Sequence, residues 1–565
     1  MDGIDIPFNL ASKDMDDSIY LSSDDAKLVN GYIDSFGRVH RVPGYTELTI
    51  LDTGKYINGL FGYHDETKYK SLLRSYTSAG GVETALPTPA SKKSVGSTDA
   101  VWIVSNSRYF GCVYEENTFK SVEMLNIDPS SISDPIFDYT AYNYRILLTR
   151  IEKCNKNSPL KFTRTKSAFY NGETFMLGSS YFLSNLDLIV FADGQHKPFI
   201  MSPIFYLHHS DDIYYHSLHQ FIKTIPDAEA PKPCSHIALI DTYLIGNNIL
   251  NGIFDISYPD YLDRWDGDFA TASYRADNIV ALLEVRHKLI LFGAESAEIW
   301  INDGTSPFSP EYNHINKGTI APYSVTNCDN VVYWLDEENR IVACDIAQGV
   351  TPTEVSTTLS KKINKSLYTY DCLGNYAKFR QERFYLADFP TQNKTFLVNT
   401  QSGFWSQLGH WNTRHNQYDA YGLLHHTYIN SLGTLAGGRT NDTIYRVGEQ
   451  YHTFDGDEIR TLIRTPVINH NTTDSKTVSR IEVLLERTMD KDLASITIDP
   501  MFMIRWRDDG ATTWQPWRRV SIDNPGRTSF FLEINRCGSY RTRQYEIVLL
   551  GDYPFCLTAM KEIHK

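Results

Sequence analysis

The chain has 565 residues, more than one domain of about 100–200 residues holds, so two to four domains are expected. Its 36 Tyr, 28 Phe and 9 Trp favour strands. A net charge of −14, from 54 basic and 68 acidic side chains, argues against a conventional nucleic-acid-binding protein with a basic face. No apolar run reaches the ~18 residues of a membrane span, and the acidic start lacks the features of a secretory signal. We expect a soluble protein made in the cytoplasm.

Short apolar runs separated by Gly, Asn or Asp turns recur along most of the chain. Their approximate starts are Tyr56, Ala100, Asp138, Leu186, His236, Asn278, Asn330, Asn375 and Tyr418. Within each unit two strand-length runs flank a polar turn, such as "VRHK" or "DEEN". The starts are spaced by roughly 40–50 residues. A repeat of this length without a long amphipathic helix predicts the four-stranded blades of a β-propeller. Nine starts exceed a ring of six or seven blades, so some belong to insertions or to a neighbouring domain.

Only two short segments favour helix. "SSDDAKLVNGYI", residues 22–33, and "TTLSKKINKSL", residues 357–367, are amphipathic and carry Ser or Thr where an N-cap would stand. The fold class expected from the whole chain is therefore all-β.

The region from about Asp457 has different content. Its alternating strands, among them "RIEVLLERTM" and "QYEIVLLGDY", predict a β-sandwich. We expect a segment 1–55 that belongs to this platform domain, a propeller over 56–455 with insertions around 75–230, and the sandwich over 456–565. The sandwich region holds 16 Lys and Arg, 12 of them Arg, against 15 Asp and Glu, so residues 1–455 carry a net charge of −15.

The most suggestive cluster for metal binding is "LHHSDDIYYHSLHQ". Its possible ligands are His208, His209, Asp211, Asp212, His216 and His219, residue types that suit a transition metal. The alternative, which we favour, is an aromatic-rich loop or hairpin tip. No cofactor is expected, because the P-loop, the nucleophile elbow, the zincin helix and the dinucleotide fingerprint are all absent from the sequence.

The eight cysteines are widely spaced and contain no C-x-x-C pair, so buried free thiols are expected rather than disulfides or a zinc site. They are Cys112, Cys154, Cys234, Cys328, Cys344, Cys372, Cys537 and Cys556.

Two further segments are interpreted as turns. "YPDYLDRWDGD", from Tyr258 to Asp268, is rich in Asp but lacks the order of a calcium loop, so Asp260 or Asp263 is expected to cap a turn. "RWRDDGATTW", from Arg505 to Trp514, is a degenerate single Asp-box, a hairpin motif that shapes a turn. Neither supplies the paired acid and nucleophile of a glycoside hydrolase.

The central region resembles a known family, the packaged-DNA stabilisation or tail nozzle (tail hub) proteins of short-tailed bacteriophages. The resemblance rests on an ordered series of residues: Trp265, Phe269, Ala270, Asp277, Arg286, Leu291, Phe292, Gly293, Ser296, Glu298, Ile299, Trp300, Gly318, Ser324, Trp334, Leu335, Ser356 and Thr357. A second match in the C-terminal region comprises Asp499, Pro500, Asp508, Asp509, Gly510, Trp514, Gly538, Arg541 and Arg543, with Ala511 in place of a second glycine. "NGYIDSFGRVHRVPGY" is a weaker match near the start.

The resemblance implies a structural protein rather than an enzyme. It implies a homohexameric ring in the virion tail, below the portal and a head-to-tail adaptor protein, assembled in the host bacterial cytoplasm. It also implies a channel for double-stranded DNA during ejection, and contacts with tail fibres or spikes and with a needle or tip.

Charge is consistent with such a conduit. Acidic walls would repel DNA phosphates, whereas Lys or Arg would bind them. Arg518, Arg519, Arg541 and Arg543 are candidates for contacts between subunits or with the adaptor, since Arg suits interfaces; the alternative for each is a solvated strand edge. Two alternative functions stay open: a propeller glycosidase acting on host glycan, and receptor binding through residues 204–220.

Overall fold

In the computed structural model of the chain, the described residues are 3–6, 27–51, 54, 56–65, 98–105, 108–115, 118–126, 150–151, 162–163, 190–194, 197–201, 206–208, 222–223, 236–241, 243–247, 252–258, 261–272, 274–275, 277–304, 308–364, 368–429, 433–486, 500–522 and 529–565. Their regular structure is almost entirely strand. The described exceptions are the helix α2 (Thr357–Ile363) and the 3₁₀ helix η5 (Pro322–Ser324). The predicted all-β class is confirmed.

In the described part of the chain, seven units of four antiparallel strands form the blades of a propeller. Five of them are separate four-stranded sheets, while blade 6 is part of a nine-stranded sheet and blade 7 part of a six-stranded sheet. They are blade 1, β6 (Ile57–Asp65), β7 (Thr98–Ser105), β8 (Arg108–Glu115) and β9 (Thr118–Asn126); blade 2, β12 (Val190–Gly194), β13 (Lys197–Met201), β14 (Tyr206–His208) and β15 (Ile222–Lys223); blade 3, β16 (Ile237–Ile240), β17 (Tyr243–Asn247), β18 (Ile253–Tyr258) and β19 (Tyr261–Thr271); blade 4, β20 (Ala281–Val285), β21 (Lys288–Phe292), β22 (Ala297–Ile301) and β23 (Ser309–Ile315); blade 5, β24 (Thr326–Cys328), β25 (Val331–Leu335), β26 (Ile341–Asp345) and β27 (Thr353–Glu354); blade 6, β28 (Leu373–Phe379), β29 (Glu382–Phe389), β30 (Lys394–Asn399) and β31 (Trp405–Leu408); and blade 7, β34 (Leu423–Ile429), β35 (Gly433–Gly438), β36 (Thr443–Gly448) and β5 (Gly44–Ile50). β10 (Arg150–Ile151) and β11 (Phe162–Thr163) form a separate pair.

The first strands of successive blades contact one another around the ring. β12 contacts β16, β16 contacts β20, and the series continues through β24, β28 and β34 to β6. β13 contacts β6 and completes the circle. Blade 7 takes its fourth strand, β5, from the N-terminal part of the chain, where Val447 pairs with Tyr45. An early strand therefore locks the last blade to the chain's beginning.

The nine predicted starts reduce to seven blades for two reasons. The run at Ala100 lies in β7, a second strand of blade 1 rather than a new blade, since β6 and β7 are separated by a long stretch of chain. The start at Asp138 lies outside the described residues. The other seven starts each fall at or next to a blade.

The turns within blades follow from the polar residues predicted to form them. Arg286 and His287 connect β20 to β21 with φ of 54° and 59°, the left-handed geometry of a tight two-residue hairpin. The apolar run after this turn is buried on both faces because neighbouring blades cover each side of the sheet. Between blades 4 and 5, Phe292 and Trp334 meet edge to face, with centroids 5.3 Å apart.

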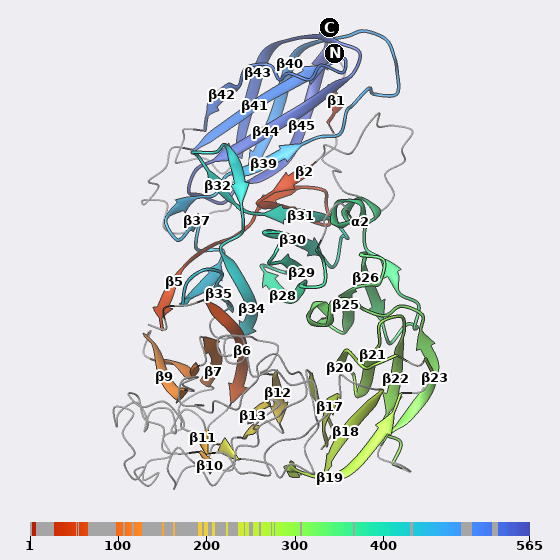
Figure 1. The fold of residues 1–565 in the computed structure, drawn as a ribbon. Helices are drawn as coiled ribbons and strands as arrows, with labels where there is room; N and C mark the ends of the chain where they lie inside the picture. Colours follow the sequence, from red (N-terminus) through yellow and green to blue (C-terminus); the bar gives the residue numbers. More distant parts are fainter. Residues whose placement is uncertain are drawn as a thin grey trace.

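The second domain is a sandwich of two sheets (Figure 1). One sheet has the order β3 (Gly31–Ile33), β4 (Val39–Arg41), β45 (Cys556–His564), β40 (Lys476–Glu486) and β43 (Ser529–Tyr540), with β1 (Gly3–Asp5) also paired to β45. The other has the order β2 (Lys27–Val29), β39 (Thr461–Arg464), β44 (Arg543–Leu550), β41 (Met501–Asp508) and β42 (Arg518–Ser521). This second sheet continues through β2 into blade 6, so a single nine-stranded sheet joins the domains.

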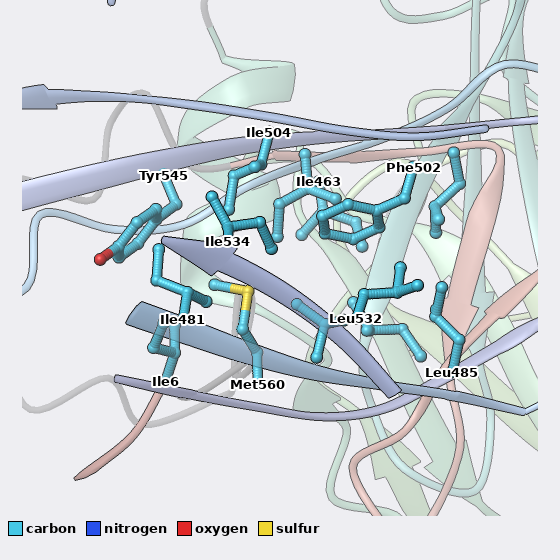
Figure 2. Close-up of a cluster of buried hydrophobic side chains, with 14 of the residues drawn as sticks. Ile6, Ile463, Ile481, Leu485, Phe502, Ile504, Leu532, Ile534, Tyr545 and Met560 are labelled. Carbon is cyan, nitrogen blue, oxygen red and sulfur yellow. The ribbon is translucent and has the colours of Figure 1, made fainter. Parts of the chain in front are cut away.

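Apolar side chains of the two sheets fill the sandwich interior (Figure 2). β43 shows the cause: its residues alternate between exposed and buried, and Phe530, Leu532 and Ile534 point inward. Facing them are Phe502 and Ile504 of β41. The alternation that predicted strands here also determines which face is the core.

Two expectations for the first 55 residues and their neighbours require correction. Residues 27–33 of the predicted helix 22–33 form β2 and β3, because pairing with β39 and β4 overrides the local helical pattern; residues 22–26 lie outside the described part. The segment 1–55 was expected to belong to the platform domain alone, but it is divided between the two domains, since β5 joins blade 7 of the propeller. At the other boundary, β37 (Thr453–Phe454) and β38 (Asp457–Glu458) attach to β5, so this hairpin straddles residue 456.

The second predicted helix is confirmed as α2. Ser356 stands at its N-cap, and the Ser356 hydroxyl accepts a hydrogen bond from the Leu359 amide at 3.3 Å. Leu359 and Ile363 bury one face of this helix in the core beside blade 5.

Candidate functional site

The residues of the central resemblance are used to hold blades together. A Cβ on Gly293 would lie 2.1 Å from the Asp277 carboxylate, and one on Gly318 would lie 2.3 Å from the Ala294 backbone. The Gly318 carbonyl accepts a hydrogen bond from Trp334 Nε1 at 2.9 Å. Close approach of the backbone therefore requires glycine at position 318, whereas a Cβ at position 293 would displace the Asp277 carboxylate.

The acids and the tryptophan of the same region are also structural. Glu298 accepts hydrogen bonds from Trp300 Nε1 at 2.9 Å and from the Tyr274 amide at 2.6 Å. Trp300 is buried against Phe254. Glu295 lies at the surface beside Arg275. These groups do not converge on a common point where a substrate would bind.

A turn that recurs in both domains joins an Asp to an Arg four residues later. Asp34 accepts from the Arg38 amide at 2.9 Å and from Arg38 Nε at 2.8 Å. Asp336 makes the same two contacts with Arg340, at 2.8 and 2.9 Å. Because the carboxylate is almost fully buried in each case, the turn depends on this pair.

A sulfur, an imidazole and a carboxylate meet between the domains, but their order does not suit nucleophilic catalysis. His40 Nε2 lies 2.9 Å from Asp34 Oδ2 and 3.6 Å from Cys556 Sγ, while Nδ1 faces Arg380 at 3.2 Å. A base needs its orienting carboxylate on the opposite nitrogen from the nucleophile. Burial raises the pKa of Cys556 to about 11, which disfavours the thiolate.

The four predicted interface arginines lie in different environments. Arg519 and Arg541 are exposed. Arg518 is half-buried and donates from its guanidinium to the Asn535 and Arg536 carbonyls, so it ties β42 to β43. Arg541 donates to the Thr473 carbonyl at 2.8 Å.

Arg543 is fully buried, which corrects the expectation that it serves an interface. Its Nε and Nη2 donate to the two Asp508 oxygens at 2.6 and 3.0 Å, and its guanidinium packs over the rings of Tyr540 and Trp506. Burial acts to lower the pKa of Arg543, but hydrogen bonds with Asp508 outweigh it and raise this pKa above its ordinary value. Arg543 is a core residue of the sandwich.

A charged ladder that sequence reasoning missed lies on the outer face of the second sandwich sheet. Glu546 is buried between Arg464 and Arg505, which donate to it from either side. Trp514 covers both guanidinium groups, with centroids 5.1 and 5.0 Å away, and Trp517 lies 4.3 Å from that of Arg505. The signal was cross-strand: Glu546 pairs in register with both arginines.

The propeller contains a pocket of about 760 Å³ lined by residues of blades 6 and 7, by the connections before and after blade 5, and by Tyr56 just before blade 1. Polar groups at its wall include Asp371, His425 and Arg439. Behind the wall, Arg439 pairs with the buried Asp388, and burial raises the pKa of Asp388 to about 6 although Arg439 acts to lower it. Burial lowers the pKa of His425 to about 4, so this imidazole is neutral near pH 7.

The possible ligands between His208 and His219, and the turn predicted between Tyr258 and Asp268, receive only partial tests. Only His208 of the His208–His219 cluster is among the described residues, as the last residue of β14. Asp263 lies within β19 and not in a turn, because β19 continues the pairing with β18 past it. The turn expected after Arg507 is confirmed at Asp509 and Gly510, both with positive φ.

One group of possible metal ligands occurs in the described part of the chain: His470, Glu562 and His564. It was not anticipated from the sequence, because His470 is 92 residues from Glu562. The five cysteines whose state is described, Cys328, Cys344, Cys372, Cys537 and Cys556, are buried free thiols as predicted. Among the described residues, no helix has the length and apolar character needed to cross a membrane.

Comparisons with known proteins give one family match. A family model described as "Bacteriophage P22 Gp10, beta-propeller" matches residues 207–450. No curated protein matches the chain.

Several solved structures share a distant likeness. One titled "YCF48 bound to D1 peptide" is 11% identical, with 65% of this chain and 94% of that chain covered and a TM-score of 0.30. Hsv2 of Kluyveromyces lactis is 10% identical over 44% of this chain and 70% of that one, with a TM-score of 0.27. The extracellular domain of the putative hybrid two component system BT4673 from B. thetaiotaomicron is 8% identical over 90% and 60%, with a TM-score of 0.37.

Structural similarity this weak supports no conclusion about this chain, so only the family match is used below. Residues 207–450, which comprise most of the propeller, are therefore similar to the bacteriophage β-propeller family of P22 Gp10.

Proposed function

We propose that this chain is a structural virion protein, the tail nozzle of a short-tailed bacteriophage, which retains packaged DNA and conducts it during ejection. The observation that carries the proposal is the match of residues 207–450 to the bacteriophage propeller family. The resemblance in the C-terminal region, which includes Asp508, Gly510 and Trp514, supports it independently.

In this proposal six copies form a ring below the portal and the head-to-tail adaptor. Tail fibres or spikes and a needle or tip attach to the same assembly, which is built in the host cytoplasm. The sandwich is the domain proposed to dock to the adaptor. Residues 456–565 hold 16 basic and 15 acidic side chains, so this region is close to neutral, and it exposes Arg519 and Arg541. Arg suits such contacts since its planar guanidinium binds carboxylates in a bidentate manner.

The charge difference between the domains supports a conduit role. Residues 1–455 carry a net charge of −15, and six copies multiply that charge around a channel. Acidic surfaces repel the phosphate backbone, so DNA can pass without the counterion release that would hold it in place. Purified protein should accordingly bind duplex DNA weakly at physiological salt.

The direct test is a nonsense mutation in the gene for this chain. Heads made without the protein should fill with DNA and then lose it, which appears as nuclease-accessible DNA after packaging. Supplying the wild-type chain in trans should restore retention. Normal DNA retention and normal infectivity without the chain would refute the proposed function.

Two further measurements separate this proposal from its alternatives. Light scattering on the purified chain should give six times the monomer mass, and a stable monomer at micromolar concentration would count against the proposal. A screen for depolymerisation of host surface polysaccharide should show no activity. Polysaccharide cleavage that survives purification would instead favour a propeller glycosidase.

A deletion tests the receptor-binding alternative. If residues 204–220 contact the cell envelope, their removal abolishes adsorption and leaves particle assembly intact. On the nozzle proposal, particles with this deletion that assemble also adsorb.

A further inference from the structure

Two imidazoles converge on one buried carboxylate at the end of the sandwich that carries β1. Glu562 is fully buried, and its Oε2 lies 3.1 Å from His470 Nε2 and 3.0 Å from His564 Nε2. The three ligand atoms all lie within 4.8 Å of one another. The His470 and His564 side chains are 9% and 18% exposed, so the cluster is nearly closed to solvent.

The fold positions each member of the cluster. Glu562 and His564 are two residues apart in β45 and therefore lie on the same face of this strand. His470 comes from the turn between β39 and β40, where it adopts φ of 53°. That turn is fixed by hydrogen bonds of Asn469 with the amides of Asn471 and Thr472, at 2.9 and 3.2 Å.

The contact between His564 and Glu562 is not a hydrogen bond. His564 Nε2 is buried and has no hydrogen-bond partner among the described residues, although it lies close to the carboxylate oxygen. In the tautomer that leaves Nε2 without a proton, its lone pair and a carboxylate lone pair at this distance repel each other. A cation between the two atoms would turn this repulsion into two bonds.

We propose that His470, Glu562 and His564 bind a divalent transition metal of the zinc class. Two imidazole nitrogens and one carboxylate oxygen are ligands that Zn²⁺ accepts. Bonds of about 2.0–2.2 Å in a tetrahedral site place ligand atoms about 3.4 Å apart. Glu562 Oε2 lies 3.0 Å from His564 Nε2 and 3.1 Å from His470 Nε2. These two separations need to open by only a few tenths of an ångström.

Two tyrosines form hydrogen bonds with the proposed metal ligands, as outer partners do at metal sites. Tyr545 donates its hydroxyl to Glu562 Oε1, and Tyr540 donates to Oε2 and lies 3.0 Å from His470 Nε2. Hydrogen bonds of this kind orient ligands and tune their basicity. The Tyr540 hydroxyl or a water would occupy the fourth position.

The metal would have a structural role, since the enclosed ligands leave little access for a substrate. It would fasten the turn after β39 to β45, at the position where Glu562 pairs with Ile4 of β1. This proposal does not depend on the proposed function, because the cluster belongs to the sandwich alone.

The test uses the untagged full chain, stripped with a chelator and then titrated with Co²⁺ and with Zn²⁺. We expect one equivalent of Co²⁺ with the intense visible bands of a tetrahedral site, its displacement by Zn²⁺, and a rise in unfolding temperature. His470→Gln and His564→Gln should each weaken Co²⁺ binding by more than tenfold, because losing even an outer partner costs about 10–100-fold. His287→Gln, at an imidazole that is 84% exposed, is the matched control and should bind Co²⁺ like wild type.

X-ray absorption on the zinc-loaded wild-type chain keeps the test decisive if a variant fails to fold. Two imidazole nitrogens at about 2.0–2.1 Å and one carboxylate oxygen are expected. A shell of water oxygens only, no stoichiometric Co²⁺ binding, or wild-type affinity in both folded variants would overturn the proposal.

Discussion

The propeller and the sandwich accommodate buried charge in different ways. In the sandwich, Arg543 binds Asp508 with two hydrogen bonds, and Glu546 lies between two arginines. In the propeller, Asp388 has one oxygen bonded to Arg439 and a second, Oδ2, that is buried without a partner in the described structure. The two nitrogens of His426 are likewise buried without hydrogen bonds there. The Arg543–Asp508 pair and the Glu546 ladder are thus expected to tolerate changes of pH near neutrality, and Asp388 of the propeller to respond to them.

The largest effect is expected from breaking the fully paired charge of the sandwich. Arg543→Ala leaves Asp508 without its partner and removes the group packed on Tyr540 and Trp506, so unfolding free energy should fall by about 3–5 kcal/mol. Chemical denaturation monitored by tryptophan fluorescence measures this. The matched control Arg541→Ala, at an exposed arginine two residues earlier, should cost less than about 1 kcal/mol. Equal losses in both variants would show that Arg543 has no special role.

A pH-dependent effect is expected from the propeller. The folded-state pKa of Asp388, about 6, is raised above its ordinary value by burial, so its contribution to stability is fully present below about pH 4 and is lost as pH rises through 6. A shift of about two units corresponds to about 3 kcal/mol. Asp388→Asn should therefore remove a loss of this size between pH 4 and pH 7, measured by denaturation at each pH.

The control for that experiment is Glu295→Gln, a carboxylate 67% exposed in blade 4. Its stability profile should follow the wild-type curve across the same range. If Asp388→Asn had the same dependence of unfolding free energy on pH as wild type, Asp388 would not be the source of the pH response expected of the propeller.

A smaller effect is expected where the connection that follows blade 4 approaches the turn between β21 and β22 closely. The Cβ of Gly318→Ala would lie 2.3 Å from the Ala294 backbone, which cannot give way like the end of a flexible side chain. The free energy of unfolding should fall by about 1–3 kcal/mol, as in other overpacked interiors. Calorimetry should show a lower unfolding temperature for the propeller. The control Asn316→Ala, at an exposed residue two positions earlier, should leave stability unchanged.

The smallest effect is expected at the cap of α2. Ser356→Ala removes the side-chain acceptor of the Leu359 amide and should cost about 1 kcal/mol. Thr357→Ala, at the exposed first residue of the helix, is the control. Indistinguishable unfolding midpoints for the two variants would show that the cap contributes little.

Local patterns predicted the blades well but could not predict how the ring closes. The turn at Arg286 and His287 is readable because polar residues interrupt alternating apolar runs. The pairing of Tyr45 with Val447 has no local signal, since the partners are about 400 residues apart and each only favours a strand. Residues 27–33 show the opposite failure, where a local helical pattern yielded to sheet pairing.

Sites were harder to predict than strands for the same reason. Arg541 and Arg543 look alike in sequence, yet Arg541 stands in the turn before β44, while Arg543 is its first residue and points inward. Likewise His470 reaches Glu562 only through the sandwich fold. Sequence spacing locates the groups of a site only when one element carries them all.

The central claim is that this chain forms the DNA-retaining nozzle of a phage tail. Cryo-electron microscopy of intact virions tests it most directly. We predict six copies around the tail axis, with their sandwich domains against the adaptor and DNA or its channel on the axis. A map in which this chain is absent from the tail, or is present away from the axis, would contradict the claim.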